Sequence, residues 1–146
     1  MNEKGSNYLR ELIRVLVRNL GILEKSDAGC CGVTIPQCHA IVEVGRANEI
    51  SLNELAEILT LDKSTMSRTI NKLVEDNLVI RESHSGDRRY ITIRLTEKGI
   101  EIFRTIESSM NKYYENIFMS ISEDKREQIL DSLQVLIEAV HKNKCC

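Results

Sequence analysis

The sequence predicts a mainly α-helical fold that carries one small antiparallel β-hairpin. Three observations support this class. Apolar residues recur at helical spacing near both ends of the chain, two short amphipathic helix patterns lie close together at residues 51–76, and the period changes from 3.6 to 2 after Asn77. The length of 146 residues is enough for one domain with its own core. We therefore expect a single domain over residues 1–146.

The first part of the chain predicts two helices. Residues 7–25 place seven leucine, isoleucine and valine side chains at helical spacing, and a loop bounded by glycines is expected at 26–32. Thr34 and Gln37 then form the pattern of a capping box, in which each side chain binds the backbone N–H of the other residue. We expect the second helix to run from there to about Ala47.

Residues 51–76 predict a helix-turn-helix. Ser51 and Glu54 form a second capping-box pattern, and leucine and alanine residues repeat at helical spacing up to Leu59. After a break, Asp62 is placed to cap a helix over residues 63–76. The apolar face expected on this helix consists of Met66, Ile70, Leu73 and Val74. Two short helices joined by a turn of about four residues are typical of this motif.

The opposite face of the helix at 63–76 carries side chains that suit double-stranded DNA. Arg68 can donate two hydrogen bonds to a guanine edge, and Asn71 can pair with adenine. Hydroxyl groups and Lys72 can reach phosphates. The candidate contacts on this face are Ser64, Thr65, Ser67, Arg68, Asn71 and Lys72. The sequence places no general base near Ser64 or Ser67, so we do not interpret these two serines as catalytic nucleophiles.

The following residues predict a basic β-hairpin. Residues 78–82 and 90–95 alternate as paired strands do, and the loop between them, 83–89, contains Gly86 and ends in Arg88 and Arg89. An arginine-tipped hairpin beside a recognition helix is a wing that suits a narrow minor groove. His84 also lies in this loop, where it either contacts DNA or stays solvated.

The charge distribution agrees with this interpretation. Residues 63–94 hold seven lysines and arginines against four acidic residues, a local balance of +3 in a chain whose net charge is −2. Such asymmetry directs one basic face toward phosphates and leaves the remainder acidic.

Two more helices are expected after the hairpin. Thr96 is placed to cap a long helix that ends near Phe118, and Ser122 begins the last helix. Together with the first helix, these carry more apolar surface than a small winged core can cover. They pack either on their own domain or on a second copy of the chain.

The stretch from Asp87 to Gly99 resembles the wing motif of the MarR family of bacterial and archaeal transcription regulators. The residues that match this motif are Asp87, Arg89, Leu95, Thr96 and Gly99. Residues 55–59 and 64–73 resemble the helix-turn-helix of the same family, and element order and length agree over nearly the whole chain.

This resemblance implies a winged helix-turn-helix over residues 34–95 and a homodimer built by the helices at 7–25 and 96–144. It also implies a pseudo-palindromic operator, whose half-sites two-fold symmetry places about one helical turn apart or a multiple of that. Most members of the family repress transcription, and an inducer releases them from DNA.

The five cysteines raise a separate question. Cys30, Cys31 and Cys38 lie within nine residues, and Cys145 and Cys146 end the sequence. Three thiolates suit a thiophilic metal or metalloid such as arsenite, mercuric ion, cuprous copper or zinc, and a histidine can complete a zinc site. The histidines considered for this are His39 and His141.

The spacing of these cysteines differs from the CxxC pairs of structural zinc sites, so alternatives stay open. One is a redox switch, in which thiolates oxidise. Another makes Cys38 a small buried side chain and the other cysteines incidental. The family resemblance adds a small aromatic or lipophilic ligand, bound in a crevice between dimer helices and winged module.

The function predicted is that of a cytoplasmic, homodimeric transcription regulator, by default a repressor. No apolar run reaches the roughly 20 residues that span a bilayer, so no membrane partner is expected. No Gly-rich phosphate loop, HExxH motif or paired-carboxylate arrangement is present, which argues against an enzyme. The competing classes are a cysteine-dependent enzyme and an adaptor that kept the winged fold without binding DNA.

Overall fold

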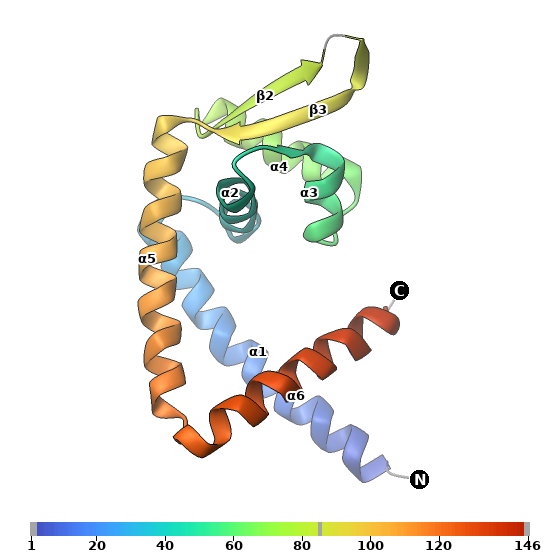
Figure 1. Ribbon diagram of the computed structural model, residues 1–146, viewed down its shortest axis with the longest axis vertical. Coiled ribbons are helices and arrows are strands. Elements are labelled where there is room, and N and C mark those ends of the chain that lie inside the picture. The colour runs from blue at the N-terminus through green and yellow to red at the C-terminus, as the bar shows by residue number, and fades with distance from the viewer. Residues whose placement is uncertain (1–2, 85, 145–146) are drawn as a thin grey trace. The chain divides into compact units, whose positions relative to one another are not determined.

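The computed structural model describes residues 3–84 and 86–144, and for residues 21–31, 84 and 87–89 the backbone alone (Figure 1). The elements in order are α1 (Glu3–Cys31), α2 (Ile35–Ala47), β1 (Ile50–Ser51), α3 (Leu52–Ile58), α4 (Lys63–Glu75), β2 (Val79–His84), β3 (Asp87–Leu95), α5 (Glu97–Ser120) and α6 (Glu123–Lys142). The prediction of a mainly helical fold with a small antiparallel hairpin is confirmed.

The chain divides into two compact units, Met1–Glu107 and Ser108–Cys146, and the division falls within α5. The first unit contains the helix-turn-helix and the sheet. The second contains the end of α5 and all of α6. Among the described residues, no helix combines the length and the apolar character that a membrane span requires.

The prediction of a loop at residues 26–32 is wrong, because α1 continues through this stretch to Cys31. Gly29 lies within the helix, where a single glycine costs only about 1 kcal/mol. The helix stops at Gly32, whose φ of +69° is the left-handed conformation that commonly follows a helix end.

The caps of the next two helices agree with the sequence in different degrees. The reciprocal box at Thr34 is formed: the backbone N–H of Gln37 donates to Thr34 Oγ1 at 3.4 Å, and that of Thr34 donates to Gln37 Oε1 at 2.9 Å. At Ser51 one of the two hydrogen bonds of the predicted box is seen: the backbone N–H of Glu54 donates to Ser51 Oγ at 3.1 Å. Ser51 also ends strand β1 opposite Thr92.

The sheet has three antiparallel strands in the order β1-β3-β2. The β2–β3 ladder runs from Val79 opposite Leu95 to His84 opposite Asp87. The predicted loop at 83–89 is therefore wrong in its extent, since both strands continue almost to Gly86, whose φ of +117° suits a tight turn. Strand β1 was not predicted, because two residues are too few to show an alternating pattern.

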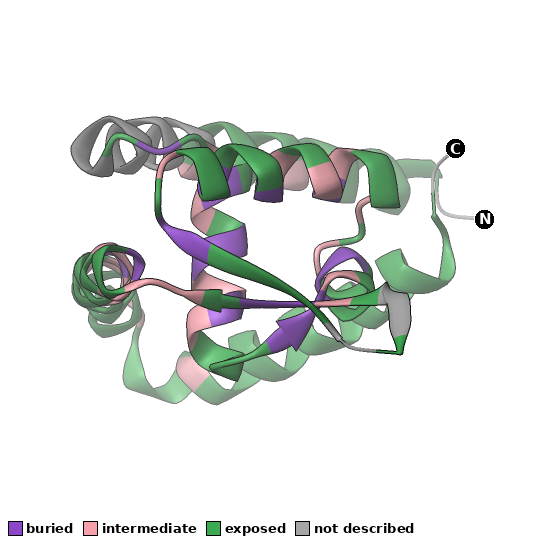
Figure 2. Cartoon of the chain, turned by 90° about the horizontal axis from the view of Figure 1, so that it is seen from above, coloured by how far each residue is buried: buried purple, intermediate pink, exposed green. Residues whose placement is uncertain are grey.

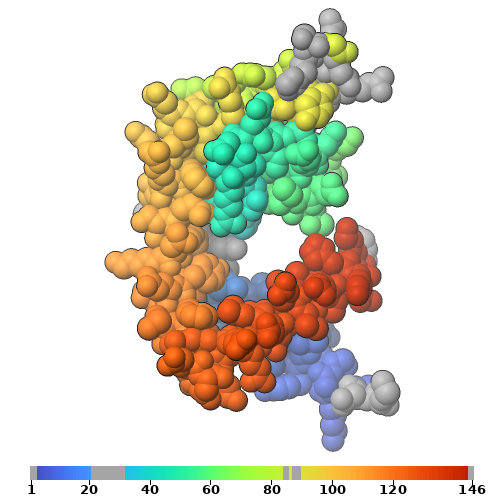
Figure 3. All heavy atoms as spheres, in the orientation of Figure 1, coloured from blue at the N-terminus to red at the C-terminus, as the bar shows by residue number. Residues whose placement is uncertain are grey.

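The core of the first unit lies between the sheet and the helices α2, α3 and α4 (Figure 2). Its fully buried large side chains are Ile41, Val44, Leu55, Met66, Ile70, Leu73 and Ile93. Side chains of β2 and β3 rest directly on these helices in the space-filling view (Figure 3). Val74, predicted for the same apolar face, is 40% exposed. It lies eight residues after Met66, which rotates it by about 80° around the helix.

The second unit is held at its helix–helix turn by one arginine. The Arg126 guanidinium donates to the main-chain oxygens of Phe118 and Ile121, both at 3.1 Å, and to that of Met119 at 3.4 Å. It also lies 5.2 Å from the centroid of the Phe118 ring. These contacts satisfy carbonyl groups that the end of α5 leaves without helical partners.

Candidate DNA-binding surface

The start of helix α4 is fixed by Asp62. Its carboxylate accepts hydrogen bonds from the Ser64 hydroxyl at 2.6 Å, the Thr65 backbone N–H at 2.7 Å and the Thr65 hydroxyl at 2.8 Å. The hydrogen bond from Ser64, followed by those from Thr65, holds the pKa of Asp62 well below its ordinary value of 3.8. The carboxylate is therefore ionised at neutral pH and completes the N-terminal turn as the sequence predicted.

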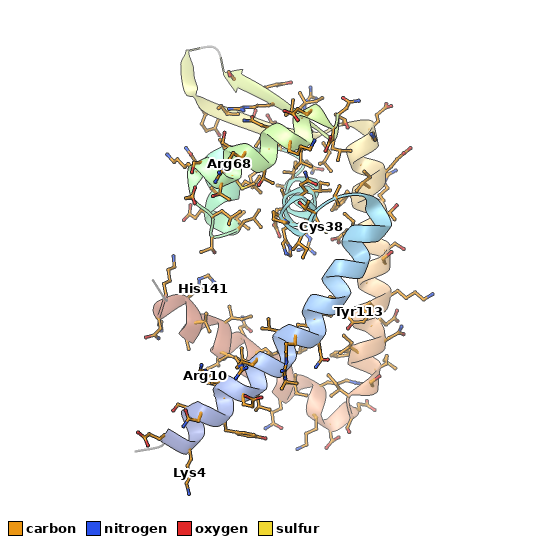
Figure 4. The ribbon with its side chains drawn as sticks, turned by 180° about the vertical axis from the view of Figure 1, so that it is seen from behind. Lys4, Arg10, Cys38, Arg68, Tyr113 and His141 are labelled. Atoms are coloured by element: carbon orange, nitrogen blue, oxygen red, sulfur yellow. The ribbon has the colours of Figure 1, made fainter. Side chains whose placement is uncertain are left out.

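Helix α4 has one buried face and one open face. Met66, Ile70 and Leu73 are fully buried, and they fix the rotation of the helix about its axis. All six predicted contact residues lie away from this row, and the four exposed ones are Ser64, Arg68, Asn71 and Lys72. Thr65 and Ser67 are half-buried. Arg68 lies on α4 within the first unit (Figure 4).

Arg68 is linked to the cap of its own helix. Its Nη2 donates to Thr65 Oγ1 at 3.3 Å, and the Thr65 hydroxyl in turn donates to Asp62. This chain of hydrogen bonds holds the guanidinium near the N-terminal half of α4 and leaves its other N–H groups on the exposed surface. An exposed, oriented guanidinium can bind a guanine edge or a phosphate.

Lys72 and Asn71 each contact another side chain of the protein. Lys72 Nζ lies 3.7 Å from a Glu75 carboxylate oxygen and 3.5 Å from one of Asp76, so its charge is shared with the last residue of its helix and with the residue that caps it. Asn71 Oδ1 accepts a hydrogen bond from Arg81 Nη1 of strand β2. The wing therefore contacts the candidate reading face directly through Arg81.

A described ion pair joins the two strands of the wing. Arg94 Nη2 lies 2.8 Å from Glu82 Oε1 across the β2–β3 ladder, and both side chains are about half exposed. The side chains of His84, Arg88 and Arg89 lie outside the described part of the structure. The backbone places these three residues in β2 and β3 near the tip, where the predicted minor-groove contacts belong.

The end of α4 is tied to the start of α5. Thr96 Oγ1 donates to the main-chain oxygen of Asn77 at 2.7 Å and accepts from the Gly99 N–H at 3.0 Å. The Thr96 N–H donates to the Leu78 carbonyl oxygen at 3.0 Å. Lys98 Nζ donates to the main-chain oxygen of Asp76 at 3.4 Å. The residues that end the candidate reading helix are thus bonded to the first turn of α5.

Comparison with known proteins agrees with this geometry. A family model described as MarR family matches residues 32–89, which contain α2, the helix-turn-helix and β2. The HTH-type transcriptional regulator BilQ of Clostridium symbiosum is 25% identical over 121 residues, covering 83% of this chain and 84% of that protein. The crystal structure of a MarR transcriptional regulator from Methanosarcina mazei Go1 superposes with a TM-score of 0.79 at 27% identity, over 93% and 98% of the two chains. Residues 32–89 match the MarR family, and the chain is similar to MarR regulators over most of its length.

The MarR-family fold extends over nearly the whole chain. Streptococcus pneumoniae FabT, crystallised in complex with DNA, matches with a TM-score of 0.83 at 20% identity, over 95% of this chain and 99% of that one. The family match over residues 32–89 and the similarity to BilQ support a winged helix-turn-helix DNA-binding transcription regulator rather than an enzyme, as predicted. The hypothesis of a cysteine-dependent enzyme is set aside.

The cysteines considered as a metal or redox sensor are described in part. Cys38 is half-buried in the first turn of α2 (Figure 4), and His39 beside it is exposed. The side chains of Cys30 and Cys31, and all of Cys145 and Cys146, lie outside the described residues. Among the side chains that are described, no three of histidine, cysteine, aspartate or glutamate converge as a metal site would require.

Proposed function

We propose that this protein is a homodimeric repressor that binds double-stranded operator DNA through two copies of the α4–wing surface. Helix α4 enters the major groove, and the hairpin tip reaches the adjacent minor groove. The observation that carries this proposal is the orientation of α4. The row Met66, Ile70 and Leu73 is fully buried, and it turns Arg68 and Asn71 outward.

The proposed contacts divide into two groups. Arg68 and Asn71 read base edges, while hydroxyls and cations bind the phosphate backbone. The phosphate and minor-groove group consists of Ser64, Thr65, Ser67, Lys72, His84, Arg88 and Arg89. Neutralised phosphates release counterions, so affinity should fall steeply with salt. The complex of FabT with DNA supports this docking by similarity of fold.

The dimer is proposed from apolar surface that each unit leaves exposed. Helix α6 has no buried residue, and Leu130, Leu133, Ile137 and Val140 recur on it at spacings of three and four. Helix α1 exposes Leu9, Leu12 and Leu16 at the same spacing. Contiguous exposed apolar stripes mark interaction surfaces. We assign residues 7–25 and 96–144 to dimerisation and 34–95 to DNA binding.

Replacing Arg68 tests the docking. Arg68→Ala should lower affinity for a selected operator by about 1–3 kcal/mol and relax preference at one base pair per half-site, because a bidentate contact to guanine is lost. The measurement is fluorescence anisotropy on duplexes that differ by single base pairs. Arg104→Ala removes an exposed arginine from α5 and should leave base preference unchanged. Equal binding by Arg68→Ala and wild type would contradict the docking.

For the signal that releases DNA, we propose thiol-based sensing of a thiophilic metal or metalloid. The proposed ligands are Cys30, Cys31 and Cys38, with Cys145 or Cys146. Two observations support this site: three cysteines lie within nine residues, and Cys38 lies at the start of α2. Arsenite, zinc, cuprous copper and mercuric ion are the candidate ions.

A small ligand is the alternative that one further observation favours. A pocket of about 310 Å³ lies within the first unit between α2, β3 and α5. Its lining includes Val44 and Phe103 together with Arg104, whose charge suits an apolar ring that bears a carboxylate.

One titration separates these signals. Zinc, arsenite, peroxide and benzoate are added in turn to the protein–operator complex, and release is read together with the mass of the cysteine-containing peptides. Release by an ion that Cys38→Ser abolishes supports the thiol site. Release by peroxide with added oxygen or a new disulfide supports a redox switch, and release by benzoate supports the pocket.

A further inference from the structure

Asn71 is joined to the wing by a residue that the DNA-contact assignment does not include. Arg81 lies on β2 opposite Ile93, and alternation along the strand places it on the same face as the buried Val79. This face of β2 packs on α4, so the Arg81 side chain reaches the reading helix. Its Nη1 donates to Asn71 Oδ1.

The chemistry of the two groups makes this contact directional. A primary amide carries one acceptor end and one donor end, and half a turn about its last bond exchanges them. A guanidinium has donors only, so it bonds to the oxygen end and disfavours the turned amide. Arg81 therefore fixes which end of Asn71 points toward it, and the Nδ2 donors point elsewhere.

We propose that Arg81 is a positioning residue that sets the base preference of Asn71. Paired reading of adenine requires both the oxygen and the nitrogen of the amide. With its oxygen held by Arg81, Asn71 presents donors to the groove, and guanine offers two acceptors there, O6 and N7. Asn71 then favours guanine over the adenine that the sequence alone suggested. This inference rests on the proposed docking of α4 in the major groove.

The wing offers a matched control for the charge of Arg81. Arg94 is also an exposed arginine of the hairpin, but its guanidinium is paired with Glu82 rather than with α4. Arg94→Gln and Arg81→Gln each remove one positive charge from the wing. Only Arg81→Gln replaces a donor-only group beside Asn71 with an amide that can both donate and accept.

The experiment uses the whole 146-residue chain and duplexes that the wild-type protein selects from a library randomised over roughly 20 base pairs, two helical turns. Competition binding then compares guanine with adenine at each position. Arg81→Gln should lose at least about fivefold of this discrimination at one base pair per half-site. Arg81→Lys should keep it, because an ammonium is also a donor-only group. Arg94→Gln should keep it as well.

A second background tests whether Arg81 acts through Asn71. In Asn71→Ala, the further change Arg81→Gln should leave base discrimination unaltered. Asn71→Asp supplies a variant that keeps the contact with Arg81, since a carboxylate accepts hydrogen bonds, yet it should lose the guanine preference because it has no donor.

Three results would overturn the positioning role. One is that Arg81→Gln lowers affinity equally for all duplexes and reduces the slope of log affinity against log salt concentration by about one. That result indicates a phosphate contact. Another is loss of discrimination that persists in the Asn71→Ala background. The third is that the wild-type protein prefers adenine at the base pair whose selection depends on Asn71. A wild-type protein that selects no sequence would instead contradict the proposed function itself.

Discussion

Asp62 shows how an acidic side chain is accommodated on a surface proposed to meet phosphates. Its carboxylate is surrounded by the hydroxyl of Ser64 and by two donors of Thr65, and Thr65 also accepts from Arg68. The negative charge thus orders the first turn of α4 and, through Thr65, the arginine proposed to read a base. A cap of this kind links helix stability to recognition.

The pKa of Asp62 gives a prediction about pH. Because its pKa is lowered in the folded chain, its contribution to stability is complete above about pH 5 and is lost as the pH falls below 3.8, its ordinary value. Asp62→Asn keeps an acceptor at this position but does not titrate. The stability advantage of wild type over Asp62→Asn, measured by urea unfolding, should therefore shrink between pH 5 and pH 2. A constant difference over that range would contradict this role.

The sequence predicted the outward direction of Arg68 and Asn71, because a helical period with a clear apolar row fixes both faces at once. It did not predict the contact between Asn71 and Arg81. That contact depends on how β2 packs on α4, and no local pattern encodes the packing of a helix on a strand. The sequence predicts that Lys72 reaches phosphates, but in the structure its charge is shared with Glu75 and Asp76.

At the scale of elements, the junction of α4 and α5 brings the helix proposed to read DNA into contact with a helix proposed to form the dimer. Thr96 and Lys98 bond to the carbonyls of residues 76–78. Gly99 lies so close to Leu78 that an added Cβ would stand 2.1 Å from its carbonyl oxygen. Only glycine allows this approach of backbone to backbone.

Gly99→Ala should therefore destabilise the protein by about 1–3 kcal/mol, the usual cost of overpacking, and should weaken operator binding by displacing α5 from the end of α4. Denaturant unfolding measures the first effect and anisotropy the second. Ser108→Ala, an exposed position on the same helix, should change stability by less than about 0.5 kcal/mol. Unchanged unfolding of Gly99→Ala would show that the junction tolerates a side chain.

Strand β1, which was not predicted, and the hairpin tip, which was predicted as a loop, share one physical property. Strand β1 and the last residues of the hairpin exist because β3 supplies their hydrogen-bond partners, not because their own residues alternate. The end of α1 continues past Gly29 although glycine is a poor helix former. The long helices α5 and α6 were predicted, since their apolar pattern is repeated over several turns.

For the whole molecule, the apolar stripe of α6 leads to a prediction about assembly. Ile137 is 57% exposed, and in the proposed dimer it is covered by the partner chain. Ile137→Glu should raise the dissociation constant of the dimer at least about tenfold, because a carboxylate would be buried without a partner. Sedimentation equilibrium measures this. Gln134→Glu adds a charge at an exposed polar position and should leave the dimer intact; equal behaviour of the two variants would contradict the assignment of the stripe.

The central claim is that two symmetric copies of α4 and the wing bind one duplex. Hydroxyl-radical footprinting on a duplex selected by the wild-type protein tests it most directly. We predict two protected windows related by two-fold symmetry, their centres about one helical turn apart, roughly 10 base pairs, or a multiple of that spacing. A single unpaired window, or protection without any sequence preference, would contradict the claim.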